Sequence, residues 1–494
     1  MTVRTERQAP LAMSAADFRD AGHRLVDQLA DALEAVPHGP VTRDESPSAV
    51  RQALNTLAPL PQRGADPATL LTDAARRLFE HSLFNGHPRF FGYITAAPAP
   101  IGILGDFVAS AVNANVGGWM LSPAATEIES QTVRWIAEFI GYPVDCGGLF
   151  VSGGNMANIV CFLAARAAKA GWDIREQGLA GARPLRVYGS EETHTWIHKA
   201  ADISGIGTSA IRWIPTGGDL RMNVAALRRQ IEADKAAGDV PFMVVGTGGS
   251  VSTGAVDPLP DIHQVCKEHG VWFHVDGAYG GFAAAVSDSP DDLRELSAAD
   301  SVAIDPHKWL YAPLEAGCAL VRDPDALRAA FAYHPPYYHF EERATNYVDY
   351  GPQNSRGFRA LKVWLALQHA GADGYRRMIV EDIQLSRAMA ALVSQSPELE
   401  LFTQALSITT FRYVPRDLRP GIGTERVERE LDALNRELLD RLQRGGEVFV
   451  SNAVIRGRYV LRACIVNFHT TAADIEAAVD MIVRAGRRLY EERR

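Results

Sequence analysis

Lys308 lies directly after an apolar run, in the stretch DSVAIDPHKW (residues 300–309), with His307 before it and Trp309 after it. A lysine amine attacks carbonyl groups only when it is unprotonated, and removal from water lowers its pKa by up to several units. A lysine on a turn at the end of a buried strand therefore predicts an amine that forms a Schiff base. The alternative is a solvated lysine at a strand end, which this stretch taken alone would favour.

Asp276 ends a second apolar run, WFHVDGAYGG (272–281), in which Phe273 and Val275 alternate with other side chains. A carboxylate at the end of a buried strand needs a positive or proton-donating partner. The small residues that follow, Gly277 and Ala278 among them, leave room for a flat group close to the backbone. The alternative is an aspartate that caps a helix or closes a turn.

Two further loops place polar groups between a strand and a helix. In VSGGNMAN (151–158), Gly153 and Gly154 would leave backbone N–H groups free to bind an anion, although a tight turn explains them equally well. In SEETHTWIHKAA (190–201), His194 is followed by His198 one helical turn later. This spacing suits a metal, but no third ligand accompanies it, and a structural histidine is the more common case.

The four loops together suit one ligand. In an open α/β sheet, ligands bind at the carboxyl ends of the strands, where all four loops are expected. An anion-binding turn, an aromatic ring that can stack, an acid that can face a ring nitrogen and an amine that can form an imine match the parts of pyridoxal 5'-phosphate. The sequence therefore predicts this cofactor and no metal.

The elements that position these loops follow from the alternation of short β-rich runs with helical runs between about residues 100 and 330. Strands separated by helices predict a mainly parallel sheet covered on both faces. Residues before about 90 predict helices with too thin a core to fold alone, so we expect them to pack on something larger, such as a second subunit. Short strands and helices after about 396 predict a smaller α/β domain.

Composition narrows the class of protein. The net charge of −9 gives no reason to expect nucleic acid or an anionic membrane as a partner. The sequence shows no apolar run of membrane-spanning length and no secretory signal at its start. The five cysteines are widely scattered, which favours neither a disulfide framework nor a zinc site. We therefore expect a cytoplasmic protein.

From about residue 14 onward, the chain resembles the group II pyridoxal-phosphate-dependent amino-acid decarboxylases, the family of aromatic-L-amino-acid decarboxylase and glutamate decarboxylase. The stretches that carry the resemblance are HPRFFGY, LSPAATEIES, GGLFVSGGNMANIVCFLAAR, HVDGAYGG, DPHKW and RGFRALKVWL. It implies the type I (aspartate-aminotransferase-like) α/β fold with a mainly parallel, seven-stranded large-domain sheet, in a homodimer with active sites at the subunit interface. The implied parts are an N-terminal helical segment that wraps the partner subunit (1–95), a large cofactor-binding domain (96–380) and a small C-terminal α/β domain (381–494).

The resemblance also implies a role for each site residue. Lys308 would form the Schiff base with the cofactor and release it to the substrate amine, and Asp276 would keep the pyridine nitrogen protonated. His194 and Ala278 would pack on the two faces of the ring, with Thr247 near its phenolic oxygen. The remaining cofactor contacts would be Gly153, Gly154 and Asn155 at the phosphate, together with His307 and Asp305.

Two of these positions depart from the family pattern. Asn155 stands where the family commonly has a serine, and it keeps both a backbone and a side-chain hydrogen-bond donor. Asp305 replaces an asparagine that touches the phosphate, and a carboxylate there would be repelled by the phosphate charge. We therefore expect Asp305 to turn toward an N–H group or a basic neighbour.

The proton donor sets the reaction type. In family members, a tyrosine on a loop protonates Cα of the substrate, and relatives with phenylalanine there make aldehydes. Tyr337, in YHPPYYHFEE (333–342), matches that tyrosine, with Tyr338 beside it and His307 as its expected partner in proton delivery. This match favours simple decarboxylation to the amine. The alternative for both tyrosines is ordinary aromatic packing within the loop.

The substrate side of the pocket departs further from the aromatic-amino-acid decarboxylases. Asn85 and Ile94 replace aromatic residues while Tyr93 remains, and the stretch NANVGGWM, expected to serve the partner subunit, has Asn115 and Gly117 at positions that are apolar in that group. Each lost apolar contact removes on the order of 1 kcal/mol of discrimination. We expect α-decarboxylation of an L-amino acid, with an aromatic one favoured and a smaller polar or acidic one left open. Aldehyde synthesis, a different reaction of the same cofactor and a catalytically silent protein stay open as well.

Overall fold

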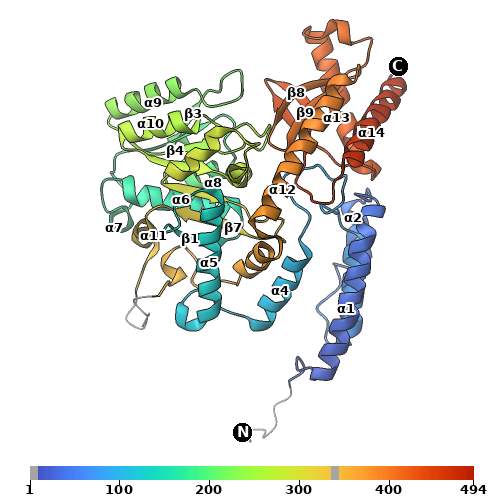
Figure 1. The fold of residues 1–494 in the computed structure, drawn as a ribbon, viewed down its shortest axis with the longest axis horizontal. Helices are drawn as coiled ribbons and strands as arrows, with labels where there is room; N and C mark the ends of the chain where they lie inside the picture. Colours follow the sequence, from blue (N-terminus) through green and yellow to red (C-terminus); the bar gives the residue numbers. More distant parts are fainter. Residues whose placement is uncertain (1–8, 335–343) are drawn as a thin grey trace, which may run out of the picture.

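The computed structural model describes residues 9–334 and 344–494, so Tyr337 and Tyr338 lie outside the described residues. Figure 1 shows three parts: N-terminal helices at one side, a large sheet with its helices, and a small sheet near the C-terminus. We call the last two the large-sheet part and the small-sheet part. The long helix α12 (Ala360–Gln395) runs from one to the other and is interrupted by non-helical backbone at Gly371.

The large sheet has seven strands in the order β1-β7-β6-β5-β4-β2-β3. Their bounds are β1 Gly147–Val151, β2 Leu185–Ser190, β3 Ile211–Ile214, β4 Val240–Thr247, β5 Trp272–Asp276, β6 Ser301–Ile304 and β7 Gly317–Val321. Strands β2 to β6 pair in parallel, whereas β7 is antiparallel to both β6 and β1. Every residue of β1, β5, β6 and β7 is buried, as a sheet covered on both faces requires. The predicted fold class is thus confirmed by the sheet itself.

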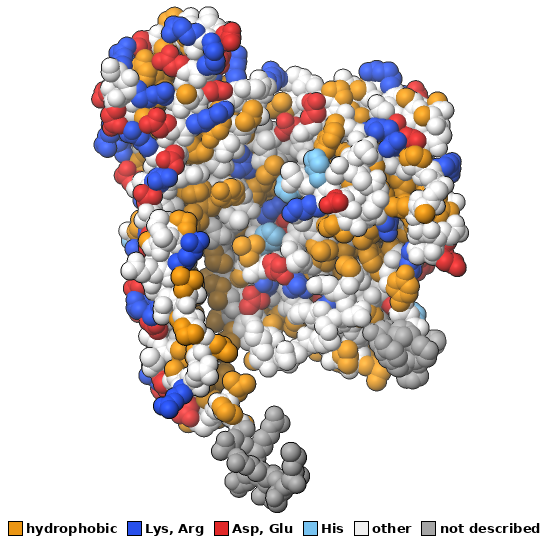
Figure 2. Space-filling view, turned by 180° about the vertical axis from the view of Figure 1, so that it is seen from behind, with side chains coloured by type: hydrophobic (Ala, Val, Ile, Leu, Met, Phe, Trp, Pro, Cys, Tyr) orange, Lys and Arg blue, Asp and Glu red, His pale blue; other side chains and the backbone are white. Residues whose placement is uncertain are grey.

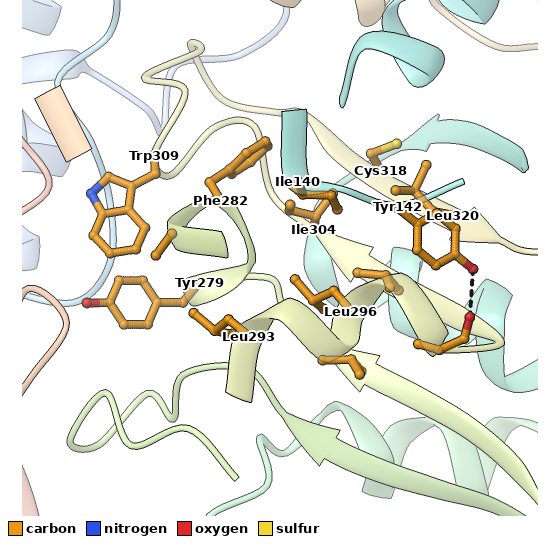
Figure 3. Close-up of a cluster of buried hydrophobic side chains, with 14 of the residues drawn as sticks. Ile140, Tyr142, Tyr279, Phe282, Leu293, Leu296, Ile304, Trp309, Cys318 and Leu320 are labelled. Atoms are coloured by element: carbon orange, nitrogen blue, oxygen red, sulfur yellow. Dashed lines mark hydrogen bonds between the residues drawn. The ribbon is translucent and has the colours of Figure 1, made fainter. Parts of the chain in front are cut away.

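Helices cover both faces of this sheet. They are α5 (Pro123–Ile140), α6 (Gly154–Lys169), α7 (Ile174–Gln177), α8 (Trp196–Ile203), α9 (Val224–Ala236), α10 (Leu259–His269) and α11 (Pro324–Phe331). Phe150 of β1 belongs to one core cluster, and its neighbours Leu149 and Val151 belong to the cluster on the opposite face. Figure 3 shows the first cluster, where Ile140, Phe282, Ile304 and Leu320 meet and the Tyr142 hydroxyl donates to the backbone oxygen of Ala299.

The small sheet is antiparallel, in the order β10-β11-β9-β8. Its strands are β8 Leu399–Ala405, β9 Ile408–Tyr413, β10 Ser451–Ile455 and β11 Arg458–Cys464, packed with α12, α13 (Glu425–Gly445) and α14 (Ala472–Glu492). The apolar stripes of α13 and α14 meet the sheet in one cluster that includes Leu438, Ile482 and Phe411.

The N-terminal part consists of α1 (Ala15–Ala35), α2 (Pro47–Leu54) and α3 (Pro67–Glu80), with α4 (Pro100–Val112) leading into the large-sheet part. Helices α1 and α3 pack on one another, but each of them buries a single residue, Ala21 in α1 and Ala75 in α3. Short 3-10 helices complete the described chain: η1 Val36–His38, η2 Trp119–Leu121, η3 Thr208–Ala210, η4 Gly280–Ala285, η5 Asp291–Ala298, η6 Tyr347–Asp349 and η7 Arg419–Gly421. Among the described helices, none combines the length and the apolar character needed to cross a lipid bilayer.

Asp382 is a buried carboxyl group in α12, 2 % exposed, at the junction of the two sheet parts. Its Oδ2 accepts hydrogen bonds from Trp309 Nε1 at 2.9 Å and from the Tyr311 hydroxyl at 2.8 Å. Because both donors are neutral, they only partly offset the loss of water. Burial therefore raises the pKa of Asp382 to about 7.

Replacement of Asp382 by asparagine should change how stability depends on pH. The folded pKa of about 7 lies above the ordinary value of 3.8, so the folded chain binds more protons than the unfolded chain between these values. The stability of the natural protein relative to Asp382→Asn should then be greatest below pH 4, fall by about 1.4 kcal/mol per pH unit, and level off above pH 7.

Urea unfolding of both proteins from pH 5 to pH 8, at equal protein concentration, measures this difference. The control is Asp373→Asn, which removes an exposed carboxylate from the same helix and should give a difference independent of pH. A constant difference between the natural protein and Asp382→Asn would show that Asp382 stays ionised in the folded chain.

Candidate active site

A cavity of about 830 Å³ opens at the carboxyl ends of the large-sheet strands. Its lining comes from the loops after β1, β2, β4, β5 and β6, and the far wall comes from β10 and β11 of the small sheet. The volume lies within the usual range for cofactor and ligand pockets. Of the residues predicted from sequence, the lining includes Tyr93, Ile94, Gly153, Gly154, Asn155, His194, Thr247, Asp276, Ala278, Asp305, His307 and Lys308.

Three predicted pocket residues lie elsewhere in this chain. Asn85 donates from Nδ2 to the backbone oxygen of Ala96 at 3.1 Å. The side-chain oxygen of Asn115 accepts from the backbone N–H groups of Gly117 and Arg356. Neither Asn115 nor Gly117 lines the cavity of its own chain. This placement leaves open the expectation that both serve a partner subunit.

The loop after β1 brings backbone unusually close to the cavity wall. Gly153 has φ +104°, which favours glycine, and it is the N-cap of α6. A Cβ atom at Gly154 would lie 2.6 Å from Asp305 Oδ2 and 3.1 Å from the Ala278 methyl group. The first turn of α6 leaves backbone N–H groups without intrahelical acceptors. The loop is therefore a cradle that fits an anion such as a phosphate group.

Asp276 is held at the end of β5 by two donors. Trp196 Nε1 donates to Asp276 Oδ2 at 2.8 Å, and the backbone N–H of Ala278 donates to Oδ1 at 3.2 Å. The residue is 7 % exposed and lines the cavity. A buried carboxylate with neutral donors suits a cationic partner in the cavity, such as a protonated pyridine nitrogen.

Lys308 forms an ion pair inside the cavity. Its Nζ lies 3.0 Å from Asp305 Oδ2, and His307 Nε2 lies 3.7 Å from the same oxygen. Asp305 is 2 % exposed, and its Oδ1 has no hydrogen-bond partner among residues 9–334 and 344–494. The expected turn of Asp305 toward a basic neighbour is thus present, and the neighbour is Lys308.

Two histidines face the cavity as neutral rings. Burial lowers the pKa of His194, and the nearby carboxylate of Asp276 opposes that shift. Burial likewise lowers the pKa of His307, opposed by Asp305. His307 Nδ1 lies 2.7 Å from the backbone oxygen of Ala316 and 3.3 Å from its backbone nitrogen, and the shorter contact, to an oxygen that can only accept, places the proton on Nδ1. A neutral His194 can stack on a flat ring without adding charge to the site.

Arg462 is a cavity residue that sequence reasoning missed. It lies in β11, is 3 % exposed, and donates from Nη1 to the backbone oxygen of Tyr93 and to the Ser451 hydroxyl, both at 3.0 Å. Its Nε and Nη2 have no acceptor in the described part of the chain. The signal was an arginine in the middle of the apolar strand YVLRACIV, because a buried cation requires an anionic or polar partner.

Comparison with known proteins places the chain in a family. Residues 47–414 match the model of the pyridoxal-dependent decarboxylase conserved domain. An aromatic-L-amino-acid decarboxylase of Bacillus atrophaeus is 32 % identical over 94 % of both chains, and a phenylacetaldehyde synthase of Petunia hybrida is 30 % identical over 91 % of this chain and 90 % of its own.

A solved structure is also similar over nearly the whole length. The crystal structure of Oryza sativa TDC with PLP and tryptamine superposes with a TM-score of 0.89 and 28 % identity, covering 98 % of this chain and 100 % of that one. The glycine cradle and the acid at the cavity end are the features that such a cofactor requires. The chain therefore belongs to the pyridoxal-dependent decarboxylase family, with the type I fold, and is a pyridoxal-phosphate-dependent amino-acid decarboxylase.

Proposed function

We propose that the protein converts an aromatic L-amino acid to the corresponding amine and CO₂. The observation that carries this proposal is the meeting of Lys308, Asp276, His194 and the glycine cradle in one cavity. Similarity to the aromatic-L-amino-acid decarboxylase of Bacillus atrophaeus supports the substrate class. When bound, pyridoxal phosphate supplies the sink for the electrons of the breaking Cα–carboxylate bond.

The residues of the chain then divide the work. Lys308 would hold the cofactor covalently through its amine until substrate binds. Asp305, whose Oδ2 lies 3.0 Å from Nζ, would orient this amine through their ion pair. Asp276, oriented by Trp196, would hold a proton at the pyridine nitrogen. The charged residues Lys308, Asp305 and Asp276 of the cavity lining thus have one assigned role each.

The other lining residues bind and orient. Gly153, Gly154 and Asn155, at the start of α6, would offer backbone N–H groups to the phosphate, and the cavity residues His194 and Ala278 would contact the ring. Thr247 lies beside Asp276 in the parallel pair of β4 and β5, where it can meet the phenolic oxygen. His307 presents an unprotonated Nε2 to the cavity and can receive a proton there.

The far wall contacts the substrate. Arg462 offers the buried cation that a substrate carboxylate requires, and Tyr93 and Ile94 offer apolar surface beside it. A wall with one cation among apolar groups suits an amino acid with an uncharged side chain better than one with a second carboxylate.

Incubation of the purified enzyme with all proteinogenic amino acids, DOPA and 5-hydroxytryptophan, followed by mass spectrometry of the amines, tests the proposal. We expect amines from aromatic substrates. Amines from only small polar or acidic amino acids would overturn the substrate class, and the absence of any amine would overturn the reaction.

Aldehyde synthesis is the second candidate, because the phenylacetaldehyde synthase of Petunia hybrida is 30 % identical to this chain. Tyr337 argues for the amine product. In air-saturated buffer, Tyr337→Phe should therefore shift the product from amine toward aldehyde, ammonia and hydrogen peroxide, because Cα loses its proton donor and dissolved O₂, with water, then oxidises the substrate instead. Product ratios by mass spectrometry measure the shift. Tyr338→Phe is the matched control and should leave the amine yield unchanged; an unchanged yield in both variants would remove Tyr337 as the donor.

We also propose a homodimer in which Asn115 and Gly117 reach the cavity of the partner. Large apolar side chains stay exposed on α1, α3, α4 and η2 of the single chain, namely Phe18, Leu70, Leu78, Leu104, Phe107, Val112, Met120 and Leu121. Figure 2 shows hydrophobic side chains along the N-terminal helices and in the hollow beside them. Exposed apolar surface of this extent marks an interface.

Met120→Asp should split the dimer, because Met120 is 70 % exposed in the single chain and lies on η2, shortly after Asn115 and Gly117. Light scattering after gel filtration should show the mass of one chain instead of two, with loss of activity. Ile203→Asp is the control: Ile203 is 71 % exposed on α8, and its change should alter neither mass nor activity. A natural protein with the mass of one chain would contradict the proposal.

A further inference from the structure

His274 is a fully buried histidine that the mechanism above does not use. It lies on β5 two residues before Asp276, so both side chains face the same side of the sheet. The ring of Trp196 packs edge-on against His274, with centroids 5.8 Å apart, while its Nε1 donates to Asp276. His274 therefore lies beneath the acid that is assigned to the pyridine nitrogen.

The hydrogen bonds on one side of His274 lead to the first turn of α6. His274 Nε2 lies 2.7 Å from Asn158 Oδ1, and Asn158 Nδ2 donates to the backbone oxygen of Gly154 at 2.8 Å. A carbonyl oxygen can only accept, so Asn158 must point its amide nitrogen at Gly154 and its oxygen at His274. It follows that Nε2 of His274 carries a hydrogen.

The hydrogen bonds on the other side fix the second ring nitrogen. His274 Nδ1 and Trp272 Nε1 both lie 2.8 Å from the hydroxyl oxygen of Ser301 on β6. An indole nitrogen can only donate, so the Ser301 oxygen accepts from Trp272 and its hydrogen is free for Nδ1 of His274. Every donor in this series of hydrogen bonds, from Trp272 to the oxygen of Gly154, then has one acceptor.

In this series, Nε2 of His274 donates and Nδ1 accepts, so the ring must be neutral. The burial of the ring also favours the neutral form. Burial lowers the pKa of His274 to about 4, so the ring is uncharged at neutral pH. A charged ring here would place a cation next to Asp276 and weaken the attraction of its carboxylate for a cation in the cavity. A neutral His274 ring connects β5 to α6 by hydrogen bonds and leaves the charge of Asp276 free to attract a cation in the cavity.

We propose that His274, as its Nε2–H tautomer, is a positioning residue that fixes Asp276 relative to the first turn of α6. The two groups that it connects are those assigned to opposite ends of the cofactor, the ring nitrogen and the phosphate. The inference rests on those assigned roles and adds to them a rigid link through Asn158. Hydrogen bonds that act in series in a buried site contribute as a unit.

The first test uses the protein without cofactor. Nitrogen-15 NMR of histidine-labelled protein should contain a signal that vanishes in His274→Gln, and this signal should be that of a ring with a hydrogen on Nε2 and none on Nδ1, unchanged from pH 5.5 to pH 8.5. A hydrogen on Nδ1, or a ring that titrates in that range, would overturn the inference whatever reaction the protein catalyses.

The second test measures the dissociation constant of pyridoxal phosphate by fluorescence titration of the apoprotein. We expect His274→Gln and Asn158→Leu each to raise this dissociation constant at least about tenfold. Because the hydrogen bonds act as a unit, the constant of the double variant should be no higher than the higher of the two single-variant constants. Asn158→Ser, a smaller change, provides the same measurement if either variant fails to fold, and should also raise the constant.

The matched control is His263→Gln. His263 stacks on Phe273 of the same strand from the opposite face of the sheet, with ring centroids 5.5 Å apart, and should leave the dissociation constant unchanged. Lower melting temperatures with unchanged cofactor binding would reduce His274 to a core residue and overturn the inference. Failure of the natural protein to bind the cofactor would instead overturn the proposed function.

Discussion

Lys308→Ala is expected to lower amine production by roughly a thousandfold or more, since no other group supplied by the described cavity lining can hold the cofactor covalently. The variant should also lose the visible absorbance of the cofactor imine. Two measurements check this: the rate of CO₂ release, and borohydride reduction of the natural protein followed by peptide mapping. The reduced cofactor should be found on the peptide that contains Lys308.

Lys199→Ala is the matched control, because Lys199 is an exposed lysine on α8, five residues after His194. It should keep both the absorbance and the rate. A label on another lysine, or a Lys308→Ala protein with normal turnover, would refute the covalent role of Lys308 and with it the role of Asp305 in orienting that amine.

Asp276→Asn is the substitution with the second largest expected effect. The amide keeps an oxygen for Trp196 Nε1 but loses the charge that holds a proton at the pyridine nitrogen. Turnover should fall on the order of a thousandfold, and the affinity for the cofactor should fall with it, because each pKa unit lost at the ring is worth about 1.4 kcal/mol. Steady-state rates with saturating cofactor separate the two effects.

Asp300→Asn is the control for that experiment. Asp300 accepts the backbone N–H of Phe273 at the opposite end of β5 and does not line the cavity, so its loss should cost stability without changing turnover. Rates near normal in Asp276→Asn would mean that the ring does not need a protonated nitrogen, and the role given to Asp276 would fail.

The large sheet could be predicted from sequence because its signal is local. Buried strands such as β5 and β6 are short apolar runs, and each site residue follows directly at the strand end, so the sheet geometry alone gathers Asp276 and Lys308 at one edge. The comparisons confirm the family, the fold and the cofactor. The roles of the individual residues remain predictions until the variants are measured.

Features that depend on contacts distant in sequence could not be predicted in this way. Arg462 reaches the cavity through the packing of two sheets whose relative placement no local pattern encodes. The direction of β7 depends on the connection over residues 305–316, which contains no helix to cross over the sheet, and β7 pairs antiparallel with β6. The link from His274 to Gly154 joins β5 to α6, and only the donor and acceptor directions in the folded chain reveal it.

Arg462 is carried on a strand of the small sheet, whereas the groups proposed to hold the cofactor follow strands of the large one. On these assignments, one wall of the substrate site and the cofactor site are encoded in separate stretches of the gene. Because Arg462 is assigned to the carboxylate that all amino acids share, a library that keeps Arg462 and varies its cavity neighbours Tyr93, Ile94 and residues 451–453 is the economical starting point for evolving new substrate preferences in this enzyme.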